Sequence, residues 1–340
     1  MRIILMHKQF SLLLTIVFLA FIFIEWQISS LHNQHTGIIT PKDIPGNKIR
    51  ETTNKFLPVV LYNRIPKSGS TSFTNLVYDL SKQNEIYILH INTTGNKLTV
   101  SLADQISLAW NITHWDAVKP AFYHGHFYYY SFSSLGFQNP YYINILREPL
   151  DRLVSHYYFL RYGDDYRKGL SRKKQGDKTT FDQCIDRGEY DCQPKKLWLQ
   201  IPMMCGQAAE CLKIGSSWAL AEAKKNVITQ YTLVGVTERI DEFVEVLEAI
   251  LPSMFRGMSK KYREGTKSHL RNTLHKEPLS EQGIAKMKNS KIYKMERELY
   301  DFTVNHFNFI KKQLTDTNGE LVSNGFRYEK VYGPKGMIIK

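Results

Sequence analysis

A strand, a turn of small residues and the start of a helix follow one another over residues 59–80, VVLYNRIPKSGSTSFTNLVYDL. The first residues are valine, leucine and tyrosine, as in a buried strand, and Pro66 ends that strand. Apolar residues then recur at helical spacing at Phe73, Leu76, Val77 and Leu80. Because the first N–H groups of a helix are unpaired and its dipole is positive there, such a turn binds anions. The stretch therefore predicts a phosphate site.

Two interpretations of this stretch remain open at the level of local residues. The Walker sequence GxxxxGK[ST] is absent, because Lys67 precedes Gly69 instead of following it. A strand–turn–helix unit with a Ser or Thr helix cap and no ligand explains the same residues.

The N-terminal residues predict a membrane anchor. Arg2 and Lys8 precede an uncharged, mostly apolar run over residues 9–24, close to the lower length limit for a span. A cleaved signal peptide is the alternative, but no small-residue cleavage site follows the run. Positive charge before the run keeps the N-terminus cytoplasmic. We expect a cytoplasmic tail over residues 1–8, a signal-anchor transmembrane helix over 9–28, a polar lumenal stem over 29–57 and one large lumenal domain over 58–340.

Two features agree with a lumenal domain. The sequons Asn92-Thr93-Thr94 and Asn111-Ile112-Thr113 are candidate glycosylation sites. The chain has four cysteines, and all of them lie in one short region: Cys184, Cys192, Cys205 and Cys211. In a lumenal protein they indicate disulfides, with three possible pairings. Zinc is the alternative, but the C-x-x-C spacing is missing, so we expect no metal site.

The chain is basic, with a formal net charge of +13. Between residues 161 and 178 several cations stand among Asp164, Asp165 and Asp177, namely Arg161, Arg167, Lys168, Arg172, Lys173, Lys174 and Lys178. Such a run forms either a solvated face or an electrostatic guide for a polyanion. Nucleic acid fits this charge equally well, but a lumenal domain does not meet it. We therefore expect a sulfated glycan as partner and no nucleic acid.

The rest of the chain predicts an α/β fold. Further strands are expected over residues 86–92, 141–146 and 231–236. After Thr237, apolar residues at helical spacing with Glu238 and Asp241 in the first turns predict a capped amphipathic helix. Strands that alternate with helices form a parallel sheet with helices on both faces, and ligands bind beyond the carboxyl ends of its strands.

Arg147 ends one expected strand, and Ser155 lies in the expected helix after Pro149. An arginine with a hydroxyl group suits a terminal phosphate. The local alternative is an arginine paired with Glu148 or Asp151.

Two further segments hold candidate functional residues. His124-Gly125-His126 contains imidazoles that can take a proton near neutral pH, although a structural or metal-binding pair has the same sequence. The basic stretch over residues 262–268, with Arg271, Thr273 and Lys276, reads locally as a surface loop.

The segment NRIPKSGSTSFTN closely resembles the 5′-phosphosulfate loop of heparan sulfate 2-O-sulfotransferases. The resemblance continues in order through YHGHF, YINILREPLDRLVS, RYGDDYR, RKKQGDKTTFDQC, KLWLQIP and KSHLR, and it extends from about residue 58 to 332. It implies a P-loop-like sulfotransferase fold over residues 58–340. It also implies the donor 3′-phosphoadenosine 5′-phosphosulfate (PAPS), a Golgi type II membrane protein, a homotrimer, and the disulfides Cys184–Cys192 and Cys205–Cys211.

The resemblance also implies a role for individual residues. His126 is expected to be the base, His124 to position substrate or base, and Lys67 to neutralise the leaving group. The implied donor-binding residues are Lys67, Ser68, Gly69, Ser70, Thr71, Ser72, Arg147, Ser155, Tyr262, Arg263, Glu264, Gly265, Thr266, Lys267, Ser268, Arg271, Thr273 and Lys276. The implied substrate contacts are Arg64, Tyr78, His90, Asp164, Arg167 and Arg172.

The chain differs from the vertebrate pattern at a few positions. Ser68-Gly69 stands where Thr-Ala is expected, Glu148 where Asp is expected, and His156 where Tyr is expected. We expect transfer of a sulfuryl group from PAPS to the 2-hydroxyl of a hexuronic acid, mainly iduronate, in heparan sulfate. The alternatives are a uronyl 2-O-sulfotransferase acting on dermatan or chondroitin sulfate, and a non-catalytic glycan-binding membrane protein.

Overall fold

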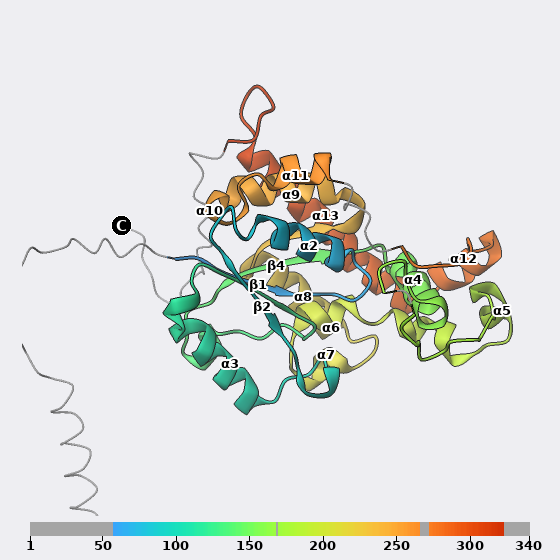
Figure 1. Cartoon of the computed structure of the whole chain (residues 1–340). Helices are drawn as coiled ribbons and strands as arrows, with labels where there is room; N and C mark the ends of the chain where they lie inside the picture. Colours follow the sequence, from blue (N-terminus) through green and yellow to red (C-terminus); the bar gives the residue numbers. More distant parts are fainter. Residues whose placement is uncertain (1–56, 168, 266–271, 323–340) are drawn as a thin grey trace, which may run out of the picture. The chain divides into compact units, whose positions relative to one another are not determined.

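The computed structural model describes residues 57–167, 169–265 and 272–322. Its centre is a parallel five-stranded sheet (Figure 1) in the order β2-β3-β1-β4-β5. The strands are β1 (Val59–Asn63), β2 (Tyr87–Ile91), β3 (Ala121–Gly125), β4 (Tyr141–Leu146) and β5 (Tyr231–Val236). The predicted parallel α/β sheet is therefore confirmed. Strand β3, which carries His124, is not among the strands expected from the sequence.

The strand order places a switch point between β1 and β4. From β1 the chain moves out to β2 at one edge and returns to β3 beside β1, and then continues to β4 and β5 on the other side. A crevice opens at such a point because neighbouring connections diverge to opposite faces of the sheet. The segments that follow these two strands carry Lys67 and Arg147.

Helices cover both faces of the sheet (Figure 1). The longer ones are α2 (Ser70–Leu80), α3 (Leu102–His114), α4 (Pro149–Tyr162), α8 (Ser217–Thr229), α9 (Ile240–Ile250) and α13 (Lys291–Leu314). The shorter ones are α5 (Phe181–Asp186), α6 (Gln200–Cys205), α7 (Ala209–Leu212), α10 (Pro252–Phe255), α11 (Met258–Glu264) and α12 (Glu281–Lys288).

Alternation along β1 explains the two layers. Val60 and Tyr62 pack with α2, α9, α10 and α11, whereas Leu61 packs with α3, α6 and α8 on the opposite face. Burial on both faces explains why β1 and β4 are continuous apolar runs in the sequence. Helix α13 contributes to both layers, through Leu299 on one side and Phe307 on the other.

A third apolar cluster joins α4, α5, α12 and the start of α13. The Cys184–Cys192 disulfide lies in it, and Cys205–Cys211 joins α6 to α7. Both bonds confirm the pairing that the family resemblance implied.

The cap expected for the helix after Thr237 is wrong. A single 3₁₀ turn (Thr237–Arg239) precedes α9, and the helix has no side-chain cap. The Thr237 hydroxyl instead donates to the carbonyl oxygen of Leu146 at 3.0 Å. Thr237 therefore joins the ends of β4 and β5, which local sequence could not indicate.

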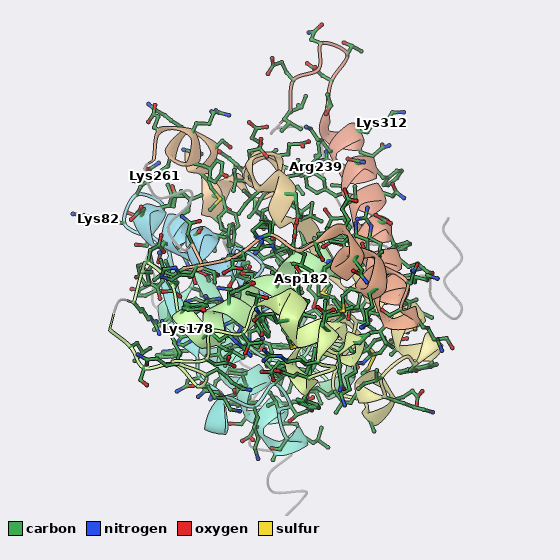
Figure 2. All side chains as sticks on the ribbon, turned by 90° about the vertical axis from the view of Figure 1, so that its right-hand side faces the viewer. Lys82, Lys178, Asp182, Arg239, Lys261 and Lys312 are labelled. Atoms are coloured by element: carbon green, nitrogen blue, oxygen red, sulfur yellow. A yellow bond between two sulfur atoms is a disulfide. The ribbon has the colours of Figure 1, made fainter. Side chains whose placement is uncertain are left out.

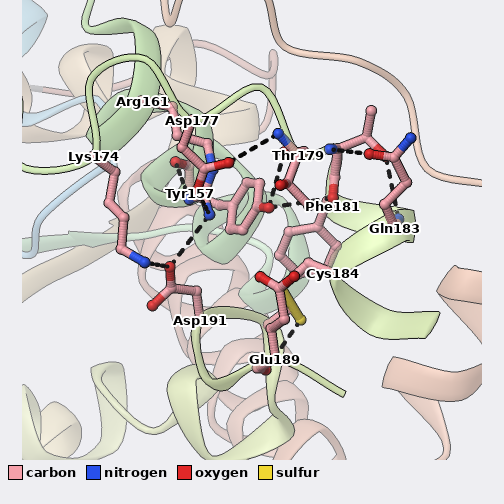
Figure 3. Close-up of polar contacts among 12 residues, drawn as sticks. Tyr157, Arg161, Lys174, Asp177, Thr179, Phe181, Gln183, Cys184, Glu189 and Asp191 are labelled. Atoms are coloured by element: carbon pink, nitrogen blue, oxygen red, sulfur yellow. Dashed lines mark hydrogen bonds and ion pairs between the residues drawn. A yellow bond between two sulfur atoms is a disulfide. The ribbon is translucent and has the colours of Figure 1, made fainter. Parts of the chain in front are cut away.

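The basic run over residues 161–178 is partly neutralised within the fold. Arg161 is buried, and its Nη2 lies 2.7 Å from Asp177 Oδ2 and 3.3 Å from Asp191 Oδ2 (Figure 3). Lys174 Nζ lies 2.8 Å from the same Asp191 oxygen. Lys178 stays exposed, on the face turned toward the viewer in Figure 2. The expected polyanion guide is therefore wrong for Arg161, which is an interior ion pair.

The expected tail, anchor and most of the stem, residues 1–56, lie outside the described residues. Among the helices that the structure describes, none combines the length and the hydropathy needed to cross a bilayer.

Candidate active site

The carboxyl ends of β1, β3 and β4 open onto a cavity of about 850 Å³. A cavity of this size accommodates a small-molecule ligand. It brings together segments far apart in sequence, because its lining includes Arg64, Lys67, Tyr78, His90, His124, His126, Arg147, Ser155, Arg167 and Tyr262.

The turn between β1 and α2 has an unusual backbone. Lys67 and Gly69 adopt left-handed conformations, with φ of 67° and 69°. Gly69 is the N-cap of α2 and no side chain caps that helix, so the proposed Ser or Thr cap is wrong. Left-handed residues in a turn form concave groups of N–H donors that bind anions. A lysine held at positive φ is strained, and such strain concentrates at functional sites.

Lys67 is held in place by residues distant in sequence. Its Nζ donates a 3.0 Å hydrogen bond to Thr273 Oγ1 and lies 4.3 Å from the centre of the Phe159 ring. The Thr273 hydroxyl is also 3.1 Å from Ser155 Oγ. Lys67 is therefore not the freely exposed loop lysine that its local sequence also allowed.

The Arg147 side chain reaches from the end of β4 to the turn after β1. Its Nη1 donates to the carbonyl oxygen of Lys67 at 3.1 Å. Glu148 instead caps α4, because its side chain accepts a 2.8 Å bond from the backbone N–H of Asp151. Within the described ranges, no ion pair joins Arg147 to Glu148 or Asp151. The guanidinium therefore faces the cavity with Ser155, as expected for an anion-binding pair.

His124 lies near the end of β3 and is buried. Its Nδ1 is 3.3 Å from Arg64 Nη1, and its Nε2 is 3.2 Å from the Tyr78 hydroxyl. A guanidinium only donates, so Nδ1 accepts and the ring proton lies on Nε2. Burial, followed by the charge of Arg64, lowers the pKa of His124 to about 3. His124 is therefore a neutral imidazole at physiological pH.

His126 has the opposite tautomer. Its Nδ1 is 2.7 Å from the backbone carbonyl oxygen of Arg64. A carbonyl only accepts, so Nδ1 carries the proton and Nε2 is the basic nitrogen. His126 lines the same cavity as Lys67. The arrangement places a proton acceptor and a cation around one space.

The substrate-contact candidates divide into two groups. Arg64, Tyr78, His90 and Arg167 line the cavity, and the His90 ring stacks on His124 with 4.9 Å between ring centres. Asp164 and Arg172 lie outside the lining and hold the loop that carries Arg167. Asp164 Oδ1 accepts from the Arg167 N–H at 2.9 Å, and Arg172 Nη2 donates to the Arg167 carbonyl oxygen at 3.4 Å.

Comparison with known proteins shows the family of the chain. Residues 54–303 match the sulfotransferase family. The chain belongs to this family. It is 45% identical to heparan sulfate 2-O-sulfotransferase 1 of Homo sapiens over 97% of this chain and 98% of that protein. It is also 52% identical to the heparin sulfate O-sulfotransferase of Drosophila melanogaster over 80% of this chain and 78% of that protein.

In this sulfotransferase, the second expected donor segment is only partly described. Residues 262–264 are the last residues of α11 and are therefore helical, not a loop. Tyr262 lines the cavity. Arg263 instead pairs with Glu245, at 2.6 Å between Nη1 and Oε1, and Glu264 lies near Lys260. Gly265 follows the helix. The candidates Thr266, Lys267, Ser268 and Arg271 lie outside the described residues.

The structure adds cavity residues that were not among the predicted site residues. His156 and Phe159 follow Ser155 on α4 and line the sulfotransferase cavity, as does Asn272. Asn92, the first candidate glycosylation site, also lies in this lining, whereas Asn111 is exposed on α3.

The apolar run ending in His124 was the signal that could have located β3. Among the described residues, no group of three His, Cys, Asp or Glu side chains could hold a metal ion.

Proposed function

We propose that this sulfotransferase moves a sulfuryl group from PAPS to the 2-hydroxyl of a hexuronic acid, mainly iduronate, in heparan sulfate. The observation that carries the proposal is the shared cavity of Lys67 and His126. It supports transfer chemistry because one group can stabilise the leaving anion while the other takes the acceptor proton. The names of the relatives support the choice of heparan sulfate.

The donor is expected at the switch point. The turn before α2 and the cation Lys67 suit the 5′-phosphosulfate, and Arg147 with Ser155 suits the 3′-phosphate. Lys276 lies outside the cavity lining, within electrostatic reach of Asp151, Arg147 and Glu148. The residues present therefore fit a nucleotide with a phosphate at each end.

The transfer follows from these positions. The acceptor oxygen forms a bond to sulfur while the bond from sulfur to the bridging oxygen breaks. His126 Nε2 takes the hydroxyl proton. Lys67 stabilises the negative charge that develops on the departing 5′-phosphate. Because both groups are held by backbone or distant side chains before the donor arrives, little reorganisation is needed during the reaction.

The acceptor is expected beside β2 and β3. Tyr78, His90 and Arg167 line this part of the cavity, and a guanidinium suits the carboxylate and sulfate groups of the glycan. Arg64 contributes by holding the two histidines: its side chain contacts His124, and its carbonyl oxygen contacts His126.

The cellular setting is part of the same proposal. The apolar run over residues 9–24 and the basic residues before it support a Golgi type II membrane protein with a lumenal catalytic domain. The sequons at Asn92 and Asn111 support glycosylation. A homotrimer is proposed from the family resemblance alone.

One acceptor assay tests the function. The purified protein is incubated with labelled PAPS and either heparan sulfate or dermatan sulfate, and the disaccharides are analysed by mass spectrometry. We expect label on the 2-position of uronate in heparan sulfate. Label only on dermatan uronate would favour the uronyl 2-O-sulfotransferase alternative, and glycan binding without transfer would favour a non-catalytic protein.

A further inference from the structure

His156 lies in the wall of the cavity, where the donor site is formed. It follows Ser155 on α4 and precedes Phe159, and all three line the cavity with Lys67. Ser155 Oγ is 3.1 Å from Thr273 Oγ1, and Phe159 lies under the Lys67 ammonium group. The imidazole is therefore placed among the groups that surround the proposed phosphates.

The charges that act on His156 are mainly positive. Arg152 precedes it by one turn of α4, Lys67 approaches from the turn after β1, and Lys196 belongs to the 3₁₀ helix over residues 194–197. Asp191 is the one acidic group that acts on it among the described residues. Burial, followed by these cations, lowers the pKa of His156 to about 4. The ring is therefore neutral at physiological pH before an anion enters.

We propose that His156 binds a phosphate group of the sulfuryl donor through a ring N–H and that the donor brings one proton from solvent onto this imidazole. The inference rests on the proposed donor, PAPS. A phosphate beside the ring adds negative charge to a cationic and partly desolvated site, which favours the imidazolium form. By linkage, protonation must then favour donor binding to the same extent.

The identity of residue 156 makes this behaviour particular to the chain. A tyrosine at this place would donate a hydrogen bond but stay neutral across physiological pH. Histidine at the same place adds a group that titrates in this range once its pKa is raised. The chain is therefore expected to hold its donor more tightly in mildly acidic conditions.

Calorimetry with 3′-phosphoadenosine 5′-phosphate tests the inference without an acceptor. Binding to the full chain is measured at pH 6 and pH 8, in buffer pairs of different ionisation enthalpy that report proton uptake. The variants are His156→Tyr and His156→Gln, with His114→Gln as control, since His114 stacks on Trp110 outside the cavity lining. Phosphate groups titrate near pH 6 themselves, so the comparison is always between variant and wild type.

We expect wild type to take up more protons on nucleotide binding at pH 6 than either variant does. If the excess averages about half a proton between pH 6 and pH 8, the affinity of wild type for the nucleotide should fall roughly tenfold more than that of the variants over this range. The His114→Gln control should match wild type. Equal proton uptake and equal pH dependence in wild type and both His156 variants would overturn the inference.

A second measurement uses wild type alone and does not depend on the folding of a variant. Diethyl pyrocarbonate modification, mapped by mass spectrometry, should slow at His156 when the nucleotide is bound; an unchanged rate would contradict the contact. Sulfuryl transfer is assayed separately. If wild type binds the nucleotide but transfers no sulfuryl group, that outcome counts against the proposed function. The binding result for His156 is unaffected by it.

Discussion

The backbone carbonyl oxygen of Arg64 accepts a 2.7 Å hydrogen bond from Nδ1 of His126. The side chain of the same arginine reaches Nδ1 of His124 at 3.3 Å. One residue thus gives two neighbouring histidines opposite tautomers, because its carbonyl only accepts and its guanidinium only donates. His126 becomes the base candidate, and His124 becomes a neutral donor to Tyr78.

Replacement of His126 by alanine should remove turnover but not donor binding. Without the basic Nε2, the acceptor hydroxyl keeps its proton, and general-base catalysis contributes roughly 10²–10⁴-fold. We expect kcat to fall by at least about 100-fold, with the Kd for 3′-phosphoadenosine 5′-phosphate nearly unchanged. Radiolabelled transfer and calorimetry measure the two quantities. Turnover close to that of a His114→Ala control would remove His126 from the mechanism.

Replacement of Arg64 by glutamine should raise the pKa of His124. Burial is the largest cause of its low pKa and the Arg64 charge the second, so the value should rise from about 3 and stay below the ordinary 6.5. The pKa of His90, which Arg64 also lowers, should rise as well. Histidine ring NMR titration measures both. Unchanged titration of His124 would show that the guanidinium does not act on it in solution.

Loss of the Cys184–Cys192 disulfide should weaken the cluster that supports α4. The bond closes a short loop, with a sequence separation of 8 residues. Chain entropy for such a loop predicts a loss of about 2.5 kcal/mol in the free energy of unfolding. Guanidinium unfolding of the Cys184→Ser/Cys192→Ser double variant measures it, with the Cys205→Ser/Cys211→Ser pair for comparison. An unchanged midpoint for the first pair would mean that the bond adds no stability.

Replacement of Glu242 by glutamine should destabilise the protein in a pH-dependent way. The Arg239 hydrogen bond, aided by Lys311, lowers the pKa of Glu242 from 4.5 to about 2. A lowered acidic pKa stabilises the fold above pH 4.5, and that contribution is lost as the pH falls toward 2. After discount for partial exposure, we expect a loss of about 1 to 2 kcal/mol at pH 7. Urea unfolding should show a smaller loss at pH 3, and an equal loss at both pH values would contradict the ion-pair explanation.

Local sequence predicted the parts of the fold that depend on short-range patterns. Strands β1, β4 and β5 are visible as apolar runs because both faces of a parallel sheet are buried. The turn around Lys67 is visible because proline, glycine and hydroxyl residues interrupt such a run. These features need no knowledge of distant partners, and the family resemblance added the disulfide pairing and the order of the site residues.

Only the tertiary structure decided what those residues can do. Lys67 and Thr273 are 206 positions apart, yet their hydrogen bond holds the cation over the cavity. The tautomers of His124 and His126 follow from contacts with Arg64 on a neighbouring strand end. The pairing of Arg161 with Asp191 and the position of His156 in the cavity lining have the same origin. The hydrogen-bond partners of a residue and the charge around it depend on which segments pack together. The order of residues along the chain does not show which distant residues become neighbours.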